Sequence, residues 1–328
     1  MTAGAPARPA AWHGEPEGYD RLNRYARVIV DEALLRGIDV EVLDAASGEL
    51  ALTGHGRRIT TFESLSELTT AAAFRRCDHK VCTRRVLERA GLQVAPGQLA
   101  TGDAHDLAFL AEWKDIVVKP ARGEGGQGLT IGVTEPDALT RALTVAQAVS
   151  PEVLLEKRCD GEDLRVIVIA GEVVAASVRR PPTVVGTGRH TVAELVETLS
   201  DERAEATGGS ARIPFDDTTA EVVAENGCNG DTLLDEGETL AVRRTANVHT
   251  GGTIDDVTEL LHPRLCEVAL VTATAIDIPV VGVDLMVAAV DGPDYTIIEA
   301  NEQPGLANHE PQPTVERFVD LLFPESAG

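Results

Sequence analysis

Positively charged and aromatic residues are scarce in this sequence. Its 328 residues include 29 Lys and Arg against 53 Asp and Glu, which gives a formal net charge of −24, and aromatic residues make up only 3%. A chain this acidic repels nucleic-acid phosphates and anionic lipids, and no cluster of Lys and Arg with interleaved aromatic residues offsets the charge. Nucleic acid is therefore disfavoured as a partner. The few cations become informative, because they must gather wherever the protein binds an anion.

Long apolar runs and paired cysteine motifs are also missing. No apolar stretch approaches the ~20 residues that span a bilayer, so the sequence predicts no membrane segment. Residues 1–18 lack the apolar core of a signal peptide, and their Ala, Pro and Gly content predicts a disordered tail. The cysteines are odd in number and form no CxxC pair, which predicts reduced thiols in a cytoplasmic protein. They are Cys77, Cys82, Cys159, Cys228 and Cys266.

Hydrophobic spacing predicts a small α/β lobe at residues 19–75. From residue 19, apolar residues recur at intervals of three and four, which is typical of an amphipathic helix, and Gly37 ends the run. Alternating and β-branched residues then predict short strands. These strands are expected at residues 38–43, 49–53 and 58–62.

A second amphipathic helix follows, with the sequence CDHKVCTRRVLERAG, and Gly91 closes it. Lys80 lies near the start of this helix, where a cation opposes the helix dipole unless an anion is close. Lys80 is therefore either a solvated lysine or a ligand for an anion.

A glycine-rich hairpin is expected at residues 115–133, DIVVKPARGEGGQGLTIGV. A buried strand ends at Lys119, a loop follows, and a second strand returns. Glycines let backbone N–H groups approach phosphate oxygens, and such a loop can close over a nucleotide as a lid. An ordinary turn is the alternative, but the lysine at its base favours phosphate, and the spacing matches neither the Walker pattern nor the Rossmann fingerprint. The loop glycines are Gly123, Gly125, Gly126 and Gly128.

A second hairpin, at residues 281–305, carries a candidate metal site. Its two strands flank a turn at Asp291-Gly292. Glu299 and Asn301 are two residues apart, so the pleat sends both side chains to one face, and Asp284 on the first strand can face them. Carboxylate and amide oxygens on rigid strands suit a hard cation such as Mg²⁺. The alternative is three polar residues on the solvated side of a sheet.

Arginines on a third hairpin predict an anionic ligand. Antiparallel strands at residues 164–169 and 173–178 turn at Gly171 and display Arg165 and Arg180. Paired arginines can decorate a surface, but in a chain with so few cations they favour a polyanion.

The stretch LAVRRTANVHTGGTIDDVT, at residues 240–258, combines hydrogen-bond donors with a turn that allows close approach. This combination suits a substrate carboxylate or an acyl-phosphate intermediate. His249 and His309 lie near these motifs, and solvated loop histidines are favoured over substrate contacts. The candidate residues of the stretch are Arg244, Asn247, Gly251 and Gly252.

Taken in order along residues 75–305, these motifs resemble the ATP-grasp superfamily. The resemblance implies an α/β (α+β) ATP-grasp fold, in which a small N-terminal α/β lobe precedes two lobes that clamp ATP between antiparallel sheets. The lobe boundaries would be 19–75, 76–160 and 161–328, with residues 201–231 an undivided mixture of helix and loop.

The resemblance also implies a role for each candidate residue. The two lysines would neutralise the α- and β-phosphates, residues 156–159 would line adenine, and Asp163 would bind ribose. The ATP site would consist of Lys80, Lys119, Gly125, Gly126, Gly128, Glu156, Lys157, Cys159 and Asp163. Mg²⁺, with Mn²⁺ as the alternative, would be held by Asp284, Glu299 and Asn301. Arg165, Arg180 and Arg244 would stabilise the transferred phosphoryl group, and Asn247, Gly251 and Gly252 would seat the substrate.

Longer stretches narrow the resemblance to amide-forming ligases. RRTANVHTGGTIDDVT and VVGTGRHTVAEL resemble the ATP-grasp part of cyanophycin synthetases. ANEQPGLANHEPQPTVERFVDLLFP and FESLSELTTAAAFRRCD resemble N-acetylglutaminylglutamine synthetases, which make an osmolyte dipeptide. The implied activity is ATP-dependent joining of N-acetylglutamine to glutamine through an acyl phosphate. The alternatives are a cyanophycin-like or secondary-metabolite amino-acid ligase, and a non-catalytic ATP-binding regulator.

The same resemblance sets expectations about partners. The residues before position 75 are too few for the acetyltransferase domain that usually precedes such ligases, and the Mur-ligase-like domain of cyanophycin synthetases is also absent from the sequence. A stand-alone ligase is therefore expected, acting on small amino-acid or dipeptide substrates. It would work with a separate acetyltransferase or amidotransferase, and a homo-oligomer is a further expectation.

Replacement of Gly126 by leucine is predicted to raise the Michaelis constant for ATP. A bulky side chain there would obstruct the loop as it closes over the phosphates. Steady-state kinetics of ADP release against ATP concentration would measure the effect. Unchanged ATP kinetics would show that the loop is only a turn.

Overall fold

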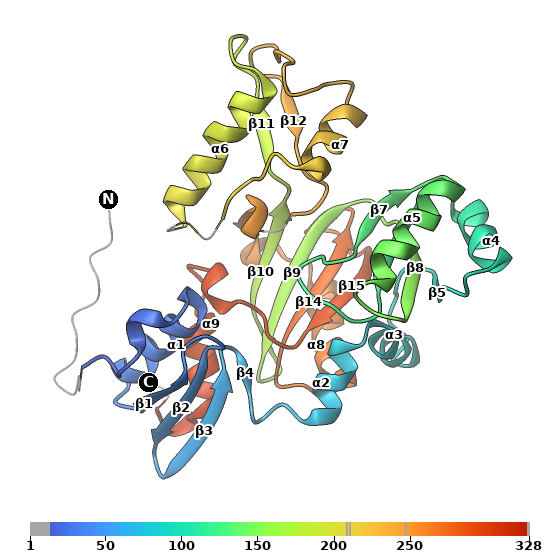
Figure 1. The fold of residues 1–328 in the computed structure, drawn as a ribbon. Helices are drawn as coiled ribbons and strands as arrows, with labels where there is room; N and C mark the ends of the chain where they lie inside the picture. The colour runs from blue at the N-terminus through green and yellow to red at the C-terminus, as the bar shows by residue number, and fades with distance from the viewer. Residues whose placement is uncertain (1–13, 208, 210, 247, 327–328) are drawn as a thin grey trace.

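The computed structural model describes residues 14–207, 209, 211–246 and 248–326. It contains three sheet-based units, one of which lies between the other two (Figure 1). The N-terminal unit has a four-stranded antiparallel sheet of order β1-β2-β3-β4. Its elements are η1 (Tyr19–Arg21), α1 (Arg24–Leu35), β1 (Asp39–Asp44), β2 (Glu49–Gly54), β3 (Arg57–Phe62) and β4 (Leu65–Ser66).

Helix α1 starts five residues later than the hydrophobic spacing predicted. Residues 19–21 form a 3₁₀ turn instead, and the side chain of Asn23 accepts a hydrogen bond from the Ala26 N–H, so the helix is capped there. The buried face of α1 packs on β2 and on α9 (Thr314–Leu322), which comes from the end of the chain. The N-terminal unit is therefore completed by the C-terminal helix, with Phe318 fully buried between them.

The central unit carries the glycine-rich hairpin. Its four-stranded antiparallel sheet has the order β5-β8-β6-β7, and one face packs on α4 and α5 through a shared apolar core. The hairpin prediction is confirmed, because β6 and β7 pair antiparallel on either side of the loop. The elements are α2 (Ala71–Asp78), α3 (Lys80–Arg89), β5 (Gly97–Leu99), α4 (Ala104–Trp113), β6 (Ile116–Pro120), β7 (Thr130–Val133), α5 (Pro136–Gln147) and β8 (Val153–Lys157).

The segment predicted as one helix around Lys80 is two helices. Cys77 and Asp78 end α2, and His79 has an extended backbone that breaks the run before α3 begins at Lys80. The Lys80 N–H donates to the Ala121 carbonyl oxygen at 2.9 Å. This bond ties the start of α3 to the base of the glycine-rich loop.

The third unit is a five-stranded antiparallel sheet of order β13-β10-β9-β14-β15. The hairpin predicted at Gly171 is confirmed, with positive φ at both Ala170 and Gly171, as a tight two-residue turn requires. The elements are β9 (Glu162–Ile169), β10 (Glu172–Arg180), β13 (Thr253–Asp256), η3 (Thr258–Leu260), α8 (Pro263–Ile276), β14 (Val280–Val287), β15 (Tyr295–Asn301), η4 (Leu306–Asn308) and η5 (Pro324–Ser326).

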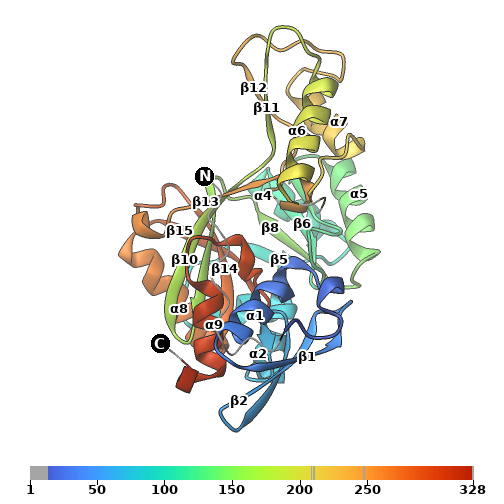
Figure 2. The same cartoon turned by 90° about the vertical axis from the view of Figure 1, so that its left-hand side faces the viewer.

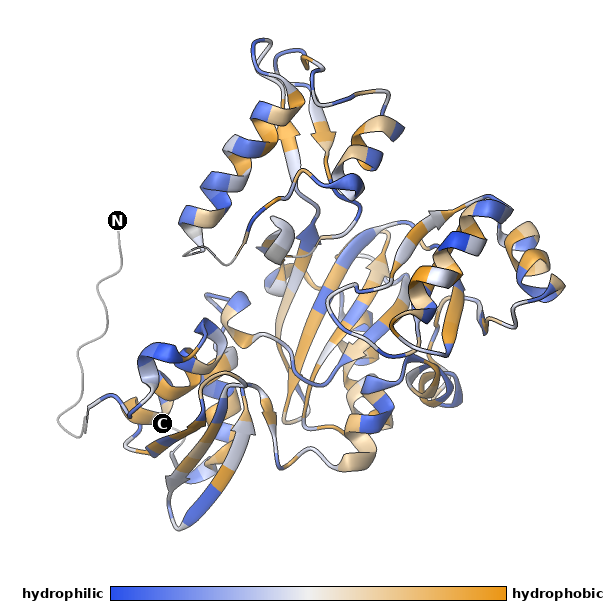
Figure 3. Cartoon of the chain, viewed as in Figure 1, coloured by the Kyte–Doolittle hydropathy of each residue, from blue (hydrophilic) through white to orange (hydrophobic). Residues whose placement is uncertain are grey.

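The strands of this sheet carry both hydrophobic and hydrophilic residues (Figure 3), and these residues are divided between its two faces. One face, which includes Leu164, Val166 and Val283, is apolar along its length and packs on α8. The other face is apolar only at one end, where Ile167 and Ile169 pack on α1 and α9. The remaining part of that second face carries charged side chains, and it faces the central unit.

Residues 181–252 form an additional module, which includes residues 201–231 that the sequence left undivided. A two-stranded sheet and two helices enclose a small apolar core. Figures 1 and 2 show the module projecting beyond the five-stranded sheet, between β10 and β13. Its elements are β11 (Thr183–Val185), α6 (Val192–Ala206), α7 (Asp217–Glu225), β12 (Thr239–Ala241) and η2 (Val248–Thr250).

Two expectations about the whole chain can be compared with the structure. All five cysteines are unpaired, in agreement with the expected free thiols. Within the part of the chain that the structure describes, every helix is too short or too polar to cross a lipid bilayer.

Candidate active site

Asp284 lies at the centre of the charged face of the five-stranded sheet. It is 4% exposed, and such a buried carboxylate must be paired. Arg165 on the neighbouring strand β9 donates two hydrogen bonds to it, from Nε at 2.7 Å and from Nη2 at 2.8 Å. The geometry is that of a bidentate Arg–carboxylate pair. Gly282 lies beside this pair, and a Cβ there would lie 3.7 Å from Arg165 Cδ and 3.1 Å from Pro304.

The second arginine of the cluster is Arg179, which the sequence analysis did not select. Its Nη2 lies 3.0 Å from Asp284 Oδ2 and 2.5 Å from Asp163 Oδ1. Arg180 is not part of the cluster, because adjacent residues of a strand point to opposite faces. Its exposed side chain pairs with Glu162 and Asp255 instead. Arg165 and Ser177 are cross-strand partners, and Arg179, two residues after Ser177, lies on the same face of the sheet. Alternation along β10 could therefore have favoured Arg179 over Arg180.

Burial and the neighbouring charges shift the pKa values of the two carboxyl groups in opposite directions. Burial would raise the pKa of Asp284, but Arg165 and Arg179 outweigh burial and hold that pKa well below its usual range. At Asp163, burial together with the charge of Asp284 outweighs Arg179 and raises the pKa. Asp284 therefore stays anionic at neutral pH, and Asp163, proposed from the resemblance as a ribose ligand, is here engaged by Arg179.

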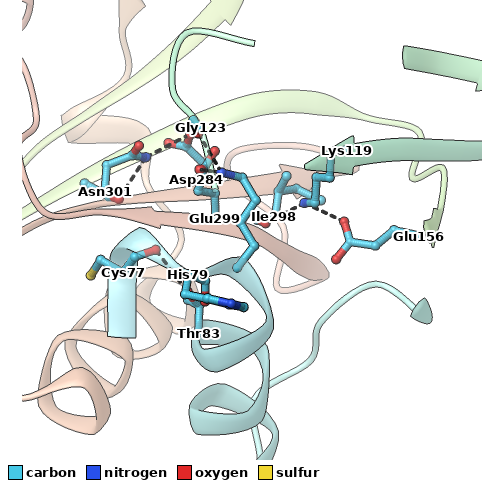
Figure 4. A network of polar contacts seen from close by, with 12 residues as sticks. Cys77, His79, Thr83, Lys119, Gly123, Glu156, Asp284, Ile298, Glu299 and Asn301 are labelled. Carbon is cyan, nitrogen blue, oxygen red and sulfur yellow. Dashed lines mark hydrogen bonds and ion pairs between the residues drawn. The ribbon is translucent and has the colours of Figure 1, made fainter. Parts of the chain in front are cut away.

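The three proposed metal ligands are neighbours on β14 and β15, as the hairpin predicted (Figure 4). Asp284 is the cross-strand partner of Glu299, and the Asn301 amide donates to Asp284 Oδ2 at 3.3 Å. Carboxylate and amide oxygens are the ligands that Mg²⁺ prefers, so the donor set fits this metal. Each carboxylate is also paired with a cation, since Lys80 Nζ lies 3.0 Å from Glu299 Oε1.

Lys80 connects β15 with the glycine-rich loop. Besides Glu299, its ammonium group donates to the Gly123 carbonyl oxygen at 2.9 Å. Lys80 is the first residue of α3, and Glu299 supplies the anion that makes a cation tolerable there. The solvated alternative is therefore wrong, because the side chain is only 12% exposed.

Lys119 lies at the end of β6 and is almost completely buried. Its Nζ is 2.6 Å from Glu156 Oε2 and donates to the Ile298 carbonyl oxygen at 3.4 Å. Glu156 is also paired with Arg84 of α3, at 3.1 Å. These residues line a narrow recess between the two sheets. Lys80 and Glu299 line the same recess.

The strand exit after β8 connects the two sheets. The Lys157 N–H donates to the Pro96 carbonyl oxygen at 2.8 Å, and its ammonium group lies 5.0 Å from the Trp113 ring centroid. Cys159 follows, and burial raises the pKa of its thiol, so it stays protonated at neutral pH. Glu156 at the end of this strand lines the recess, while the Lys157 side chain points to Trp113 of α4.

The glycine-rich loop has the backbone that its sequence requires. Four of its glycines have positive φ: Gly123, Gly125, Gly126 and Gly128. Gly128 is also packed, since a Cβ there would lie 3.0 Å from Val149, whereas a Cβ at Gly126 would meet only Leu129 at 4.0 Å. The space around Gly126 is therefore more open than the space around Gly128.

The candidates at residues 243–252 lie where the additional module rejoins β13. Arg244 forms an ion pair with Glu225 of α7, away from the cluster around Asp284. Gly251 and Gly252 are required by packing, because a Cβ would clash with Ile213 at 2.2 Å and with the Ala246 backbone at 2.8 Å, respectively. Asn247 and the side chain of His249 lie outside the described residues. The structure does not bring Arg244 to the phosphate side of the site.

His309 is a buried residue and not the solvated loop histidine that was favoured. It is 4% exposed, and its Nδ1 lies 3.4 Å from Ser177 Oγ on the charged face of β10. Burial, reinforced by Arg165 and Arg179, lowers its pKa to about 4. A neutral imidazole therefore borders the arginine pair at neutral pH.

His309→Gln is predicted to reduce the acid sensitivity of folding. The pKa of His309 is about 4 in the folded chain against 6.5 ordinarily, so between these values the unfolded chain binds a proton that the folded chain does not. The wild type should lose ~2 kcal/mol more than the variant in the free energy of unfolding between pH 7 and pH 4.5. Urea denaturation at both pH values measures this difference. The exposed His105→Gln serves as control, and equal losses in wild type and His309→Gln would contradict the burial of the imidazole.

Curated proteins with related sequences are cyanophycin synthetases and glutathione biosynthesis proteins. The cyanophycin synthetase of Nostoc sp. is 31% identical over 77% of this chain and 30% of its own length. The glutathione biosynthesis bifunctional protein of Streptococcus thermophilus is 29% identical over 95% of this chain and 44% of its own length. The chain thus spans less than half the length of these relatives. No family model matches the chain.

Solved structures give the same picture of the fold. A bifunctional glutathione synthetase from Pasteurella multocida superposes with a TM-score of 0.67 at 25% identity, over 94% of this chain and 44% of that one. A D-alanine–D-alanine ligase from Bacillus anthracis has a TM-score of 0.50 at 16% identity, over 79% of this chain and 70% of that one, which supports the fold alone. Two facing antiparallel sheets, a glycine-rich hairpin and the Asp284–Glu299–Asn301 strands accompany these likenesses, and the chain is a member of the ATP-grasp superfamily.

Proposed function

We propose that this protein is an ATP-dependent carboxylate–amine ligase that forms an amide bond through an acyl phosphate. The observation that supports the proposal most strongly is the pairing of cations with carboxylates in one recess and directly beside it. Lys80 pairs with Glu299, Lys119 with Glu156, and Arg165 with Asp284. A nucleotide with its metal supplies alternative partners for both kinds of charge, since phosphates attract the cations and the metal attracts the carboxylates.

The nucleotide would lie in the recess between the central unit and β15. Lys119 and Lys80 line it and would neutralise phosphate charge, while the glycine-rich loop closes over the phosphates. Glu156 and the strand exit that follows it would border adenine, as the ATP-grasp resemblance implies. Asp163 would become free for ribose once Arg179 turns to an anionic ligand.

The metal would be held by Asp284, Glu299 and Asn301. Bound there, Mg²⁺ would offset phosphate charge and polarise the phosphoryl oxygens. Arg165 and Arg179 lie beside this site and would stabilise the phosphoryl group as it passes from ATP to the substrate carboxylate. An amine then attacks the acyl carbon, the C–N bond forms, and phosphate leaves with the electron pair of the broken C–O bond.

The substrate pair proposed first is N-acetylglutamine and glutamine. Support comes from the sequence stretches that resemble N-acetylglutaminylglutamine synthetases, at residues 62–78 and 300–324. The names of the related proteins offer other products, cyanophycin and glutathione. An amino-acid ligase with one of these other specificities is therefore the second candidate. Cytoplasmic location, a homo-oligomer and a separate acetyltransferase or amidotransferase stay predictions.

An ADP-release assay with product mass spectrometry tests the proposal. ATP, Mg²⁺ and glutamine are incubated with and without N-acetylglutamine, followed by a panel of other amino acids. ADP and an N-acetylated dipeptide mass only with both substrates would support the first candidate. Release of ADP with other amino acids would retain the chemistry and exclude that substrate. Nucleotide binding without any substrate-dependent ADP release would favour the non-catalytic regulator.

Arg179→Gln is predicted to lower turnover by ~100-fold, as expected for loss of one preorganised donor to a transferring phosphoryl group. The adjacent Arg180→Gln is the matched control, because that side chain points to the opposite face and pairs with Glu162 and Asp255. Turnover of the control should change by less than about threefold. The same assay measures both variants, and equal losses would show that the strand parity in the cluster is not the one described.

A further inference from the structure

Arg84 is a partly buried cation in the recess, and the ATP-grasp motifs do not describe a role for it. It lies on the second turn of α3, with a side chain that is 12% exposed, and it lines the recess with Lys119 and Glu156. Its guanidinium group donates to the Ala95 carbonyl oxygen and pairs with Glu88 at 3.0 Å and with Glu156 at 3.1 Å. Arg84 therefore reaches from the helix surface to the floor of the recess.

Glu156 is shared by two cations. Its Oε1 is 3.1 Å from Arg84 Nη1, and its Oε2 is 2.6 Å from Lys119 Nζ. The Glu156 side chain is only 7% exposed, so water screens these charges weakly. A lone Lys119–Glu156 pair would be neutral and would attract phosphate poorly. Arg84 adds a second positive charge. Its other partner, Glu88, is 49% exposed and therefore screened by water, so the less exposed part of the cluster keeps an excess of positive charge facing the recess.

The packing around the triad is built to hold it. Gly97 on β5 is the cross-strand partner of Glu156. A Cβ at Gly97 would lie 2.9 Å from Glu156 Cγ, 3.0 Å from Arg84 Nη1 and 2.7 Å from the Leu155 carbonyl oxygen. A larger residue would therefore displace the Arg84–Glu156 contact, and glycine leaves the space that the contact occupies.

We propose that Arg84 is a positioning residue for nucleotide binding, which neutralises Glu156 and thereby keeps the charge of Lys119 available to the phosphates. The inference rests on the proposed function, because it assigns the recess to a nucleotide. It differs from a purely structural role in one respect: it acts on phosphate recognition and leaves recognition of the nucleoside largely unchanged.

The test compares the affinities of ADP with Mg²⁺ and of adenosine, measured by isothermal titration calorimetry on the full chain. The ratio of the adenosine Kd to the ADP Kd reports the phosphate contribution alone. Arg84→Gln should lower this ratio by about tenfold, because Glu156 then pairs with Lys119 alone and neutralises its charge toward the phosphates. Arg85→Gln, an exposed neighbour on α3, should leave the ratio unchanged. A loss of both affinities in equal proportion, or an unchanged ratio in Arg84→Gln, would overturn the proposal.

A second substitution separates charge from folding. In Arg84→Gln/Glu156→Gln the carboxylate is absent, so the ratio should return to the wild-type value or exceed it. A ratio that stays low in the double variant would overturn the proposal. Arg84→Lys retains the charge and should retain most of the ratio even if Arg84→Gln does not fold. Failure of wild-type protein to bind ADP at all would instead overturn the proposed function, and this inference with it.

Discussion

The pairing of buried and partly buried cations with carboxylates is the constraint on which the candidate site depends. A chain with a net charge of −24 has few cations, and several of them are concentrated between the two facing sheets. Removing charges from water is costly unless each one is paired. The pairs Lys80–Glu299, Lys119–Glu156 and Arg165–Asp284 meet that requirement without a ligand. A polyanion with a divalent cation can exchange these partners at little additional electrostatic cost.

The position of the pairs follows from how the five-stranded sheet is covered. One face packs on α8 along its length, so the residues there are apolar. The other face is covered at one end by α1 and α9, where β9 contributes Ile167 and Ile169. Beyond that cover the same strand face continues with Arg165 and Asp163, which pair with charged side chains. The N-terminal unit and the C-terminal helix thus determine where the apolar part of this face ends and its charged part begins.

The connection between the lobes also involves backbone contacts. Lys119 of the central unit donates to the Ile298 carbonyl oxygen on β15, and Lys80 bridges Gly123 and Glu299. Side chains that the proposed ligand would use therefore join three elements: the glycine-rich loop, the start of α3 and β15. Occupation of the recess would change the contacts of all three elements together.

Much of the fold and part of the site could be predicted from the sequence. Alternation predicts the strands, and periodicity predicts the helices. The Gly-rich hairpin and the spacing of Glu299 and Asn301 identify the phosphate and metal candidates, because these patterns depend on neighbouring residues in the chain. Local sequence does not report which of two adjacent arginines faces the site. Arg179 takes that place because the pairing of β10 with β9 aligns it with Asp163, whereas Arg180 points to the other face. The burial of His309 and the shared carboxylate of Glu156 likewise depend on elements far apart in sequence.

The sequence by itself determined the local elements and the residue types suited to an ATP-grasp site. Only the tertiary structure decided which of these charges meet, because ion pairs such as Arg165–Asp284 form across strands that are separated by more than a hundred residues.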